Sequence, residues 1–70
     1  MYKIKINKYW LGGWNEGETY FNDNKVYRPE YASREVDALE FGDDYLDISI
    51  KRLRILQRMG AEINFGIKKL

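Results

Sequence analysis

The sequence predicts an α+β fold, with a small, mainly antiparallel sheet of three to four strands covered by one long helix. Two patterns lead to this prediction. Apolar and polar residues alternate near both ends of the chain, as in strands, and apolar residues recur every three or four positions over 44–59, as in an amphipathic helix. Because the chain has only 70 residues, it has room for one hydrophobic core, and we expect a single domain over 1–70.

The expected order of elements is β-β-β-short helix-α-β, and it begins with a strand over residues 2–11. The inward face of this strand would carry Tyr2, Ile4, Ile6 and Trp10. Gly12-Gly13 then predicts a turn, because glycine adopts turn conformations at no steric cost. Trp14 would follow in an irregular loop.

Two short strands are expected next, over residues 19–21 and 25–28. The cluster Asn22-Asp23-Asn24 predicts a turn between them, because Asn and Asp tolerate left-handed backbone. Pro29 would end the later strand, since proline cannot donate a hydrogen bond to a neighbouring strand. Residues 30–42 would then form one or two helical turns capped by Ser33, with inward-facing Val36, Ala38 and Leu39 and with Phe41 packed near the end.

The long helix over 44–59 is the clearest element. Asp43 or Asp44 is expected to cap its start, and Gly60 is expected to end it in a left-handed conformation. The stripe that faces the sheet is formed by Leu46, Ile50, Leu53 and Leu56. Residues 61–67 alternate again and predict a closing strand.

The helix carries more apolar residues than a small sheet can cover. Ile48, Ile55 and Met59 lie beside the inward stripe. Large apolar patches are seldom left exposed on a monomer. We therefore expect either that the sheet curls around this flank or that a second subunit covers it in a homodimer.

The residue types present argue against an enzyme. The chain has no His and no Cys, and its few aliphatic hydroxyls, on Thr19, Ser33 and Ser49, lie in no nucleophile motif. The acidic residues near position 44 are explained by the start of a helix. We therefore expect no catalytic residues, no cofactor and no metal. No apolar run is long enough for a membrane span and no signal-peptide pattern is present, so we expect a cytosolic protein.

The small net charge of +1 conceals two opposed blocks. Residues 30–47 hold seven carboxylates and one arginine, a balance of −6, whereas residues 48–70 have a balance of +5. The acidic block is either an ordinary solvated face or a surface that meets a basic partner. For the second interpretation, the expected contact residues are Glu30, Glu35, Asp37, Glu40, Asp43 and Asp44, with Trp14 as an aromatic anchor.

The basic block offers an alternative function. Lys51, Arg54 and Arg58 would form a stripe on the solvent face of the long helix, and a basic stripe near aromatic residues suits single-stranded nucleic acid. The alternative to a protein partner is therefore a small nucleic-acid-binding protein that uses these three cations.

The layout resembles that of small accessory proteins of Firmicute phages and prophages. The resemblance rests on the opening Met1-Tyr2-Lys3-Ile4-Lys5-Ile6, on Glu18-Thr19-Tyr20-Phe21, and on Ala38-Leu39-Glu40-Phe41 before a capped helix and a closing strand. This sequence departs from the usual pattern of these proteins at the helix cap, which is Gly42-Asp43-Asp44. The resemblance implies a viral protein of the host cytosol that binds and modulates or inhibits a host protein of the defence or replication machinery. The acidic block would then mimic nucleic acid.

Overall fold

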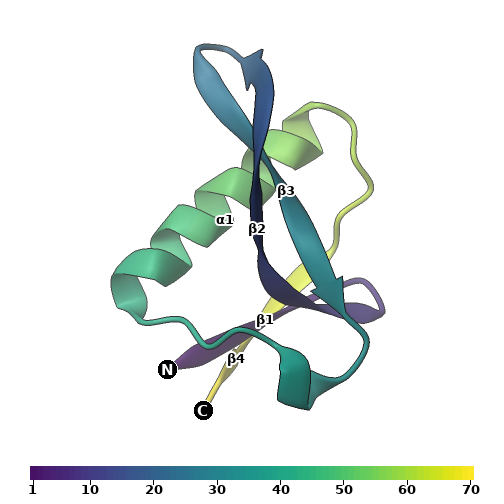
Figure 1. Cartoon of the computed structure of the whole chain (residues 1–70), viewed down its shortest axis with the longest axis vertical. Helices are drawn as coiled ribbons and strands as arrows, with labels where there is room; N and C mark the ends of the chain where they lie inside the picture. The colour runs from purple at the N-terminus through teal and green to yellow at the C-terminus, as the bar shows by residue number, and fades with distance from the viewer.

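The computed structural model describes residues 1–70 as four strands, one short 3-10 helix and one α-helix. In chain order these are β1 (Tyr2–Ile6), β2 (Tyr9–Phe21), β3 (Asn24–Ala32), η1 (Glu35–Asp37), α1 (Asp43–Arg58) and β4 (Phe65–Lys69). The strands form one sheet in the order β3-β2-β1-β4, and every pairing in it is antiparallel. The predicted α+β class and the predicted order of elements are confirmed (Figure 1).

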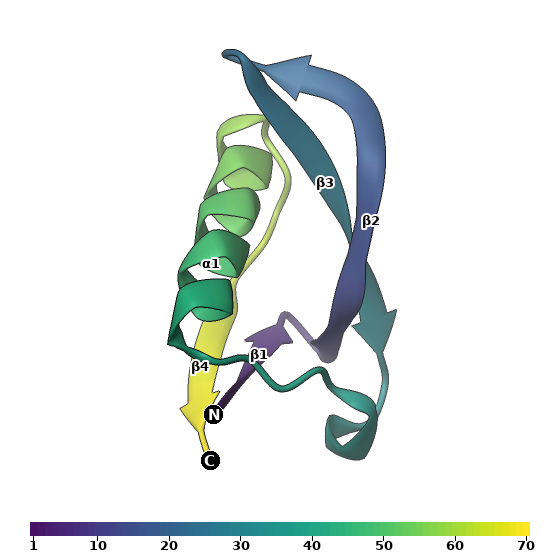
Figure 2. The ribbon, with the colours of Figure 1, turned by 60° about the vertical axis from the view of Figure 1, so that its left-hand side comes forward.

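The sheet is strongly bent, and α1 lies on its concave side. The hairpin of β2 and β3 rises along one side of α1, whereas β1 and β4 lie near the other end of the molecule (Figure 2). Two register irregularities interrupt the β2–β3 pairing, between Leu11 and Gly13 and between Glu16 and Tyr20. Bulges of this kind increase the twist of a strand, which accounts for the way the hairpin turns away from β1 and β4.

A tight turn at Asn7-Lys8 divides the single strand that was expected over 2–11. Asn7 has a φ of 54°, and the turn brings Lys5 opposite Trp10 and Ile6 opposite Tyr9. The expected inward position of Trp10 is therefore wrong, because paired residues share a face and Lys5 points away from buried Ile6. Leu11, fully buried, takes the inward position instead.

The positions of Gly12-Gly13 and Pro29 also differ from expectation. The two glycines lie inside β2 at the first irregularity, not in a turn, and β2 continues through Trp14 to Phe21. Pro29 lies inside β3, opposite Trp14. Since β3 is an edge strand, it can accommodate a residue that lacks a backbone donor. The turn predicted at Asn22-Asp23-Asn24 is confirmed, with φ of 50° at Asn22 and 65° at Asp23.

The segment between β3 and α1 contains less helix than expected. Only the three residues of η1 are helical, and no side chain caps them. Val36 is 73% exposed and Leu39 is 38% exposed, so the inward positions expected for them are wrong, whereas Ala38 and Phe41 are buried. Phe41 exchanges two backbone hydrogen bonds with Tyr2. This segment thus binds to β1 at the point where β2 has turned away.

Helix α1 follows the predicted pattern except at its cap. Gly42 occupies the N-cap position, and no side chain caps the helix, so the capping role expected of Asp43 or Asp44 is wrong. Both residues instead lie in the first turn, where the positive end of the helix dipole stabilises a carboxylate. Gly60 ends the helix with a φ of +98°, as predicted.

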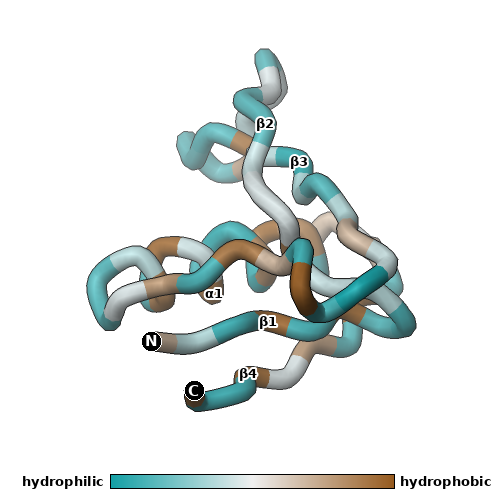
Figure 3. Tube along the Cα trace, turned by 60° about the horizontal axis from the view of Figure 1, so that its bottom comes forward, coloured by the Kyte–Doolittle hydropathy of each residue, from teal (hydrophilic) through white to brown (hydrophobic).

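One hydrophobic core fills the space between α1 and the sheet. Its buried members are Ile4, Ile6, Leu11, Phe41, Leu46, Leu53 and Ile63, with half-buried Ile50 and Leu56 packed against them. The hydropathy colouring of Figure 3 shows apolar segments gathered between α1 and β1. The apolar stripe predicted for the helix is the one that faces this core.

The closing strand is shorter and later than expected. Residues 61–64 belong to no helix or strand, and β4 starts at Phe65. Asn7 holds this connection through three hydrogen bonds, with a side-chain amide donating to the carbonyl of Glu62 at 3.0 Å and two further bonds to the backbone of Asn64. The two chain ends lie close together at one end of the molecule (Figure 1).

Candidate binding surfaces on helix α1

The acidic residues predicted to contact a partner fall into two groups in the structure. Glu35 accepts a hydrogen bond from Lys68 Nζ at 2.7 Å, and Asp37 pairs with Arg34 at 3.0 Å. These two carboxylates are therefore occupied inside the chain. The other acidic residues named in the prediction are exposed and form no ion pair: Glu30, Glu40, Asp43 and Asp44.

Glu35 is placed by the sheet as well as by η1. Lys3 and Lys68 lie opposite each other on β1 and β4, and Lys3 Nζ donates to the backbone carbonyl of Glu35 at 2.8 Å. The hydrogen bond from Lys68 lowers the pKa of Glu35, and the positive charges of Lys68, Lys3 and Lys5 lower it further against a smaller opposing effect of desolvation. Glu35 thus fixes η1 onto the sheet.

The remaining carboxylates concentrate at the start of α1. Asp43, Asp44 and Asp47 are exposed within the first five helical residues, and exposed Glu40 precedes them. We call the set Glu40, Asp43, Asp44 and Asp47 the acidic surface. It combines the positive end of the helix dipole with four negative side chains that have no cation within ion-pairing distance. No group of three or more acidic side chains has the geometry to hold a metal ion.

Trp14 does not lie in a loop, as expected, but in β2. It is half-buried against the core, and its Nε1 donates a hydrogen bond to Ser49 Oγ at 2.9 Å. Ser49 is fully buried in α1. The anchor role was based on an exposed loop position for Trp14, and that position is wrong. Trp14 instead connects the hairpin to the helix.

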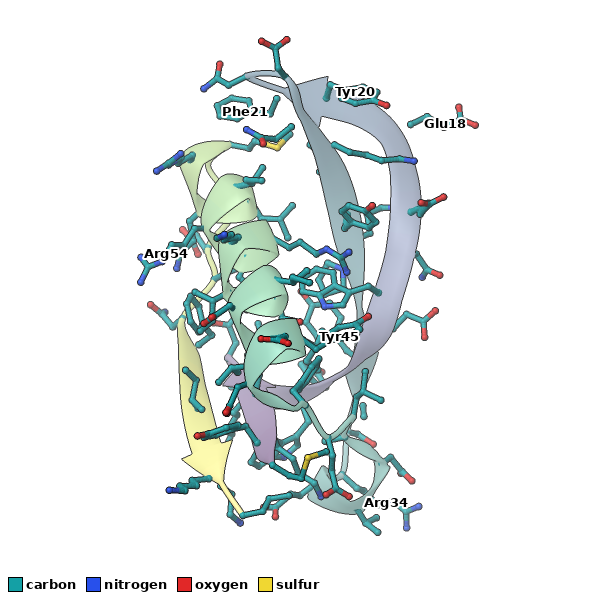
Figure 4. The ribbon with its side chains drawn as sticks, turned by 90° about the vertical axis from the view of Figure 1, so that its left-hand side faces the viewer. Glu18, Tyr20, Phe21, Arg34, Tyr45 and Arg54 are labelled. Atoms are coloured by element: carbon teal, nitrogen blue, oxygen red, sulfur yellow. The ribbon has the colours of Figure 1, made fainter.

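A cation surrounded by aromatic rings lies between α1 and the hairpin. The guanidinium carbon of Arg52 is 3.7 Å from the ring centroid of Tyr27, 5.5 Å from that of Trp14 and 6.0 Å from that of Tyr45. Figure 4 shows Tyr45 on the side of α1 that faces the hairpin. Arg52 is half-buried and forms no ion pair, so its interactions with these rings replace a carboxylate partner. The sequence did not indicate this cluster, because Trp14 and Tyr27 are far from Arg52 in the chain.

The three cations named for the nucleic-acid alternative do come together. Lys51, Arg54 and Arg58 line a shallow groove of about 190 Å³ with half-buried Ile55 and with Asn24 from the tip of the hairpin. We call this the basic groove. All three cations are exposed and none forms an ion pair. Arg54 projects from the side of α1 opposite Tyr45 (Figure 4) and lies 6.0 Å from the ring centroid of Phe65.

A second, larger depression lies on the hairpin. It has a volume of about 410 Å³ and lies beside the second irregularity of β2, where three residues of β2 face Val26 alone. Its lining residues are Glu16, Gly17, Glu18, Thr19, Val26, Arg28 and Met59. Its lining carries charges of both signs, from Glu16 and Glu18 and from Arg28, and Glu16 also forms an ion pair with Lys25 at 3.3 Å.

The chain matches no protein-family model, no curated protein and no solved structure. None of its helices has the length and apolar content that crossing a membrane requires. The two charged surfaces of α1 are therefore the features that bear on function.

Proposed function

We propose that this chain is a non-enzymatic accessory protein of phage type, which binds a host protein of the defence or replication machinery and modulates or inhibits it. The observation that carries the proposal is the acidic surface at the start of α1. Four exposed carboxylates without an intrachain partner repel one another, and a complementary basic surface on a partner would relieve this repulsion.

The kind of partner follows from the chemistry of the surface. A protein groove lined with Lys and Arg binds the phosphates of nucleic acid, and closely spaced carboxylates offer that groove similar anionic oxygens. The contact residues of this proposal are the acidic surface (Glu40, Asp43, Asp44 and Asp47) and, from β3, the exposed and unpaired Glu30. Glu35 and Asp37 are left out of it, because their carboxylates are already bound within the chain.

The experiment is capture from a Firmicute cell lysate in the presence and absence of competitor DNA. The immobilised protein should retain a host protein that a short DNA duplex displaces. The variant Glu40→Lys with Asp43→Lys should lose it, whereas Glu18→Lys with Glu62→Lys, which changes the charge equally elsewhere on the exposed surface, should not. Retention that resists DNA, or equal retention by both variants, would contradict the proposal.

The basic groove favours a second candidate function, the binding of single-stranded nucleic acid. Three unpaired cations along one groove offer contacts to successive phosphates. A gel shift with a labelled oligonucleotide tests this candidate. Binding should weaken steeply with salt and be lost when Lys51, Arg54 and Arg58 are replaced by Gln, and failure to bind at low salt would exclude it.

A further inference from the structure

The exposed face of α1 carries a stripe with the spacing of a helix-pairing seam. Positions 44, 48, 51, 55 and 58 follow one another at intervals of four, three, four and three residues. This alternation keeps residues on the side of a helix that meets another helix. The stripe consists of Asp44, Ile48, Lys51, Ile55 and Arg58, of which Ile48 is 45% exposed and Ile55 is half-buried.

Charge changes sign along this stripe. Asp44 and neighbouring Asp47 lie in the N-terminal half of α1, whereas Arg58 and neighbouring Arg54 lie in the C-terminal half. None of the four side chains is paired within the chain. The face is therefore acidic at one end, basic at the other, and apolar in between at Ile48 and Ile55.

This distribution is complementary to itself when one copy is reversed. Asp44 and Arg58 are each seven residues from Lys51, which corresponds to about 10 Å along the helix axis on either side. A twofold axis at Lys51 would place Asp44 of one copy against Arg58 of the other, and would bring Ile48 to within about one residue (about 1.5 Å along the axis) of the level of Ile55. A twofold interface requires this reciprocal matching, in which each contact occurs twice.

We propose that two copies of this chain associate through antiparallel pairing of α1, with the acidic end of each helix in the basic groove of the other. This proposal goes beyond the proposed function and does not rest on it. Both use Asp44 and Asp47, so a host protein that binds the acidic surface would have to displace the second copy. The two Lys51 side chains would meet at the axis, where their long stems can carry the charges outward to solvent. The small apolar centre makes the dimer weak and sensitive to salt, as for interfaces at the low end of the size range.

Charge complementarity selects a second copy as the occupant of the basic groove. The groove presents two arginines and a lysine, and the same chain carries two unpaired aspartates at the matching distance from the axis. The exposed Ile48 is also accounted for, since it would pack against Ile55. A phosphate backbone would satisfy the cations but would leave Ile48 exposed.

The test is a reciprocal charge exchange measured by sedimentation equilibrium. A variant with two added arginines at the acidic end (Asp44→Arg with Asp47→Arg) and a variant with two added glutamates at the basic end (Arg54→Glu with Arg58→Glu) should each dissociate at least about tenfold more readily than the wild type. Mixed in equal amounts, they should form a heterodimer, because both ends of the antiparallel pair are then complementary. The control pair Glu18→Lys and Glu62→Lys should leave association unchanged.

Two results would overturn the proposal. One is a wild type that stays monomeric up to about 1 mM. The other is a mixture of two folded variants, checked by circular dichroism, that fails to associate. If the wild type stays monomeric and its basic groove binds an oligonucleotide, the dimer is contradicted and the nucleic-acid function is favoured.

A cysteine experiment tests the axis without altering the acidic or the arginine side chains. The chain has no native Cys, so a single introduced thiol gives an unambiguous readout. Lys51→Cys lies at the proposed axis and should form an intermolecular disulfide on mild oxidation, because a symmetric pair there falls near the required separation. Glu18→Cys, exposed on the hairpin, should crosslink far less. Equal crosslinking of the two variants would contradict the antiparallel arrangement.

Discussion

The guanidinium carbon of Arg52 lies 3.7 Å from the ring centroid of Tyr27, and this contact joins α1 to the hairpin that rises beside it. Arg52 turns toward three aromatic rings, while Lys51, Arg54 and Arg58 line the basic groove, and of these three Arg54 has one more distant ring contact, with Phe65. The four cations of this half of α1 therefore have two different roles: Arg52 joins the helix to the hairpin, and the other three form the basic groove.

Replacing Arg52 by Ala should lower the free energy of unfolding by about 1–2 kcal/mol, because a partly desolvated cation–π contact is lost together with the packing of the arginine stem. Arg54→Ala is the matched control and should change stability by less than about 0.5 kcal/mol, since Arg54 is exposed. Urea unfolding of both variants gives the comparison. Equal losses would mean that the rings do not stabilise the helix through Arg52.

Ser49 has the same connecting role through a hydrogen bond. Because Ser49→Ala leaves the Nε1 donor of Trp14 without its partner in a half-buried site, it should cost about 1–3 kcal/mol. Trp14→Phe removes the donor, so Ser49→Ala should cost much less in that background. A double-mutant cycle by urea unfolding measures the difference, and strictly additive effects would show that the bond does not contribute.

Gly17 is required where β2 approaches β3. A Cβ at this position would lie 2.5 Å from the carbonyl oxygen of Val26, a backbone atom that cannot move aside alone. Gly17→Ala should therefore destabilise the protein by about 1–3 kcal/mol. Gly66→Ala in β4 meets nothing within 4 Å and should be close to neutral. Thermal unfolding of the two variants compares them, and a neutral Gly17→Ala would indicate that the hairpin yields at its second irregularity.

Glu35 should give the fold a dependence on acid pH. Its pKa is lowered in the folded protein, first by the hydrogen bond from Lys68. Its contribution is therefore fully present above the unfolded value of about 4.3 and is lost as the pH falls through the lower folded value. A carbon-13 NMR titration of the Glu35 carboxyl group should show the lowered pKa, and Lys68→Gln should raise it toward the ordinary range. An identical titration in the variant would rule out the contact.

The sequence predicted those features whose structure is determined by residues close together in the chain. The periodicity of α1, the stop at Gly60 and the turn at Asn22-Asp23-Asn24 each follow from residues close together in the chain. The turn at Asn7-Lys8 was missed because Lys8, which interrupts the apolar face of the expected strand, was interpreted as a residue near the end of that strand. This interruption, together with an Asn that tolerates left-handed backbone, was the local signal of the turn.

Features that depend on tertiary contacts could not be predicted in this way. Glu35 and Lys68 are 33 positions apart, and nothing near either residue indicates that they meet. Without that contact, Glu35 was grouped with the other carboxylates of the acidic block. Asp37 was grouped with them as well, although its partner Arg34 is only three positions away in the chain. By contrast, Lys51, Arg54 and Arg58 were predicted to lie together because helix geometry alone places them on one face.

The most direct test of the proposed function is the affinity of the captured host protein at two salt concentrations. If the acidic surface makes the contact, the variant Glu40→Lys with Asp43→Lys should bind at least about tenfold more weakly than the wild type and should lose much of the salt dependence. Glu18→Lys with Glu62→Lys should keep both the affinity and the salt dependence. An unchanged affinity and an unchanged salt dependence in the first variant would contradict the proposal and would place the contact elsewhere on the protein.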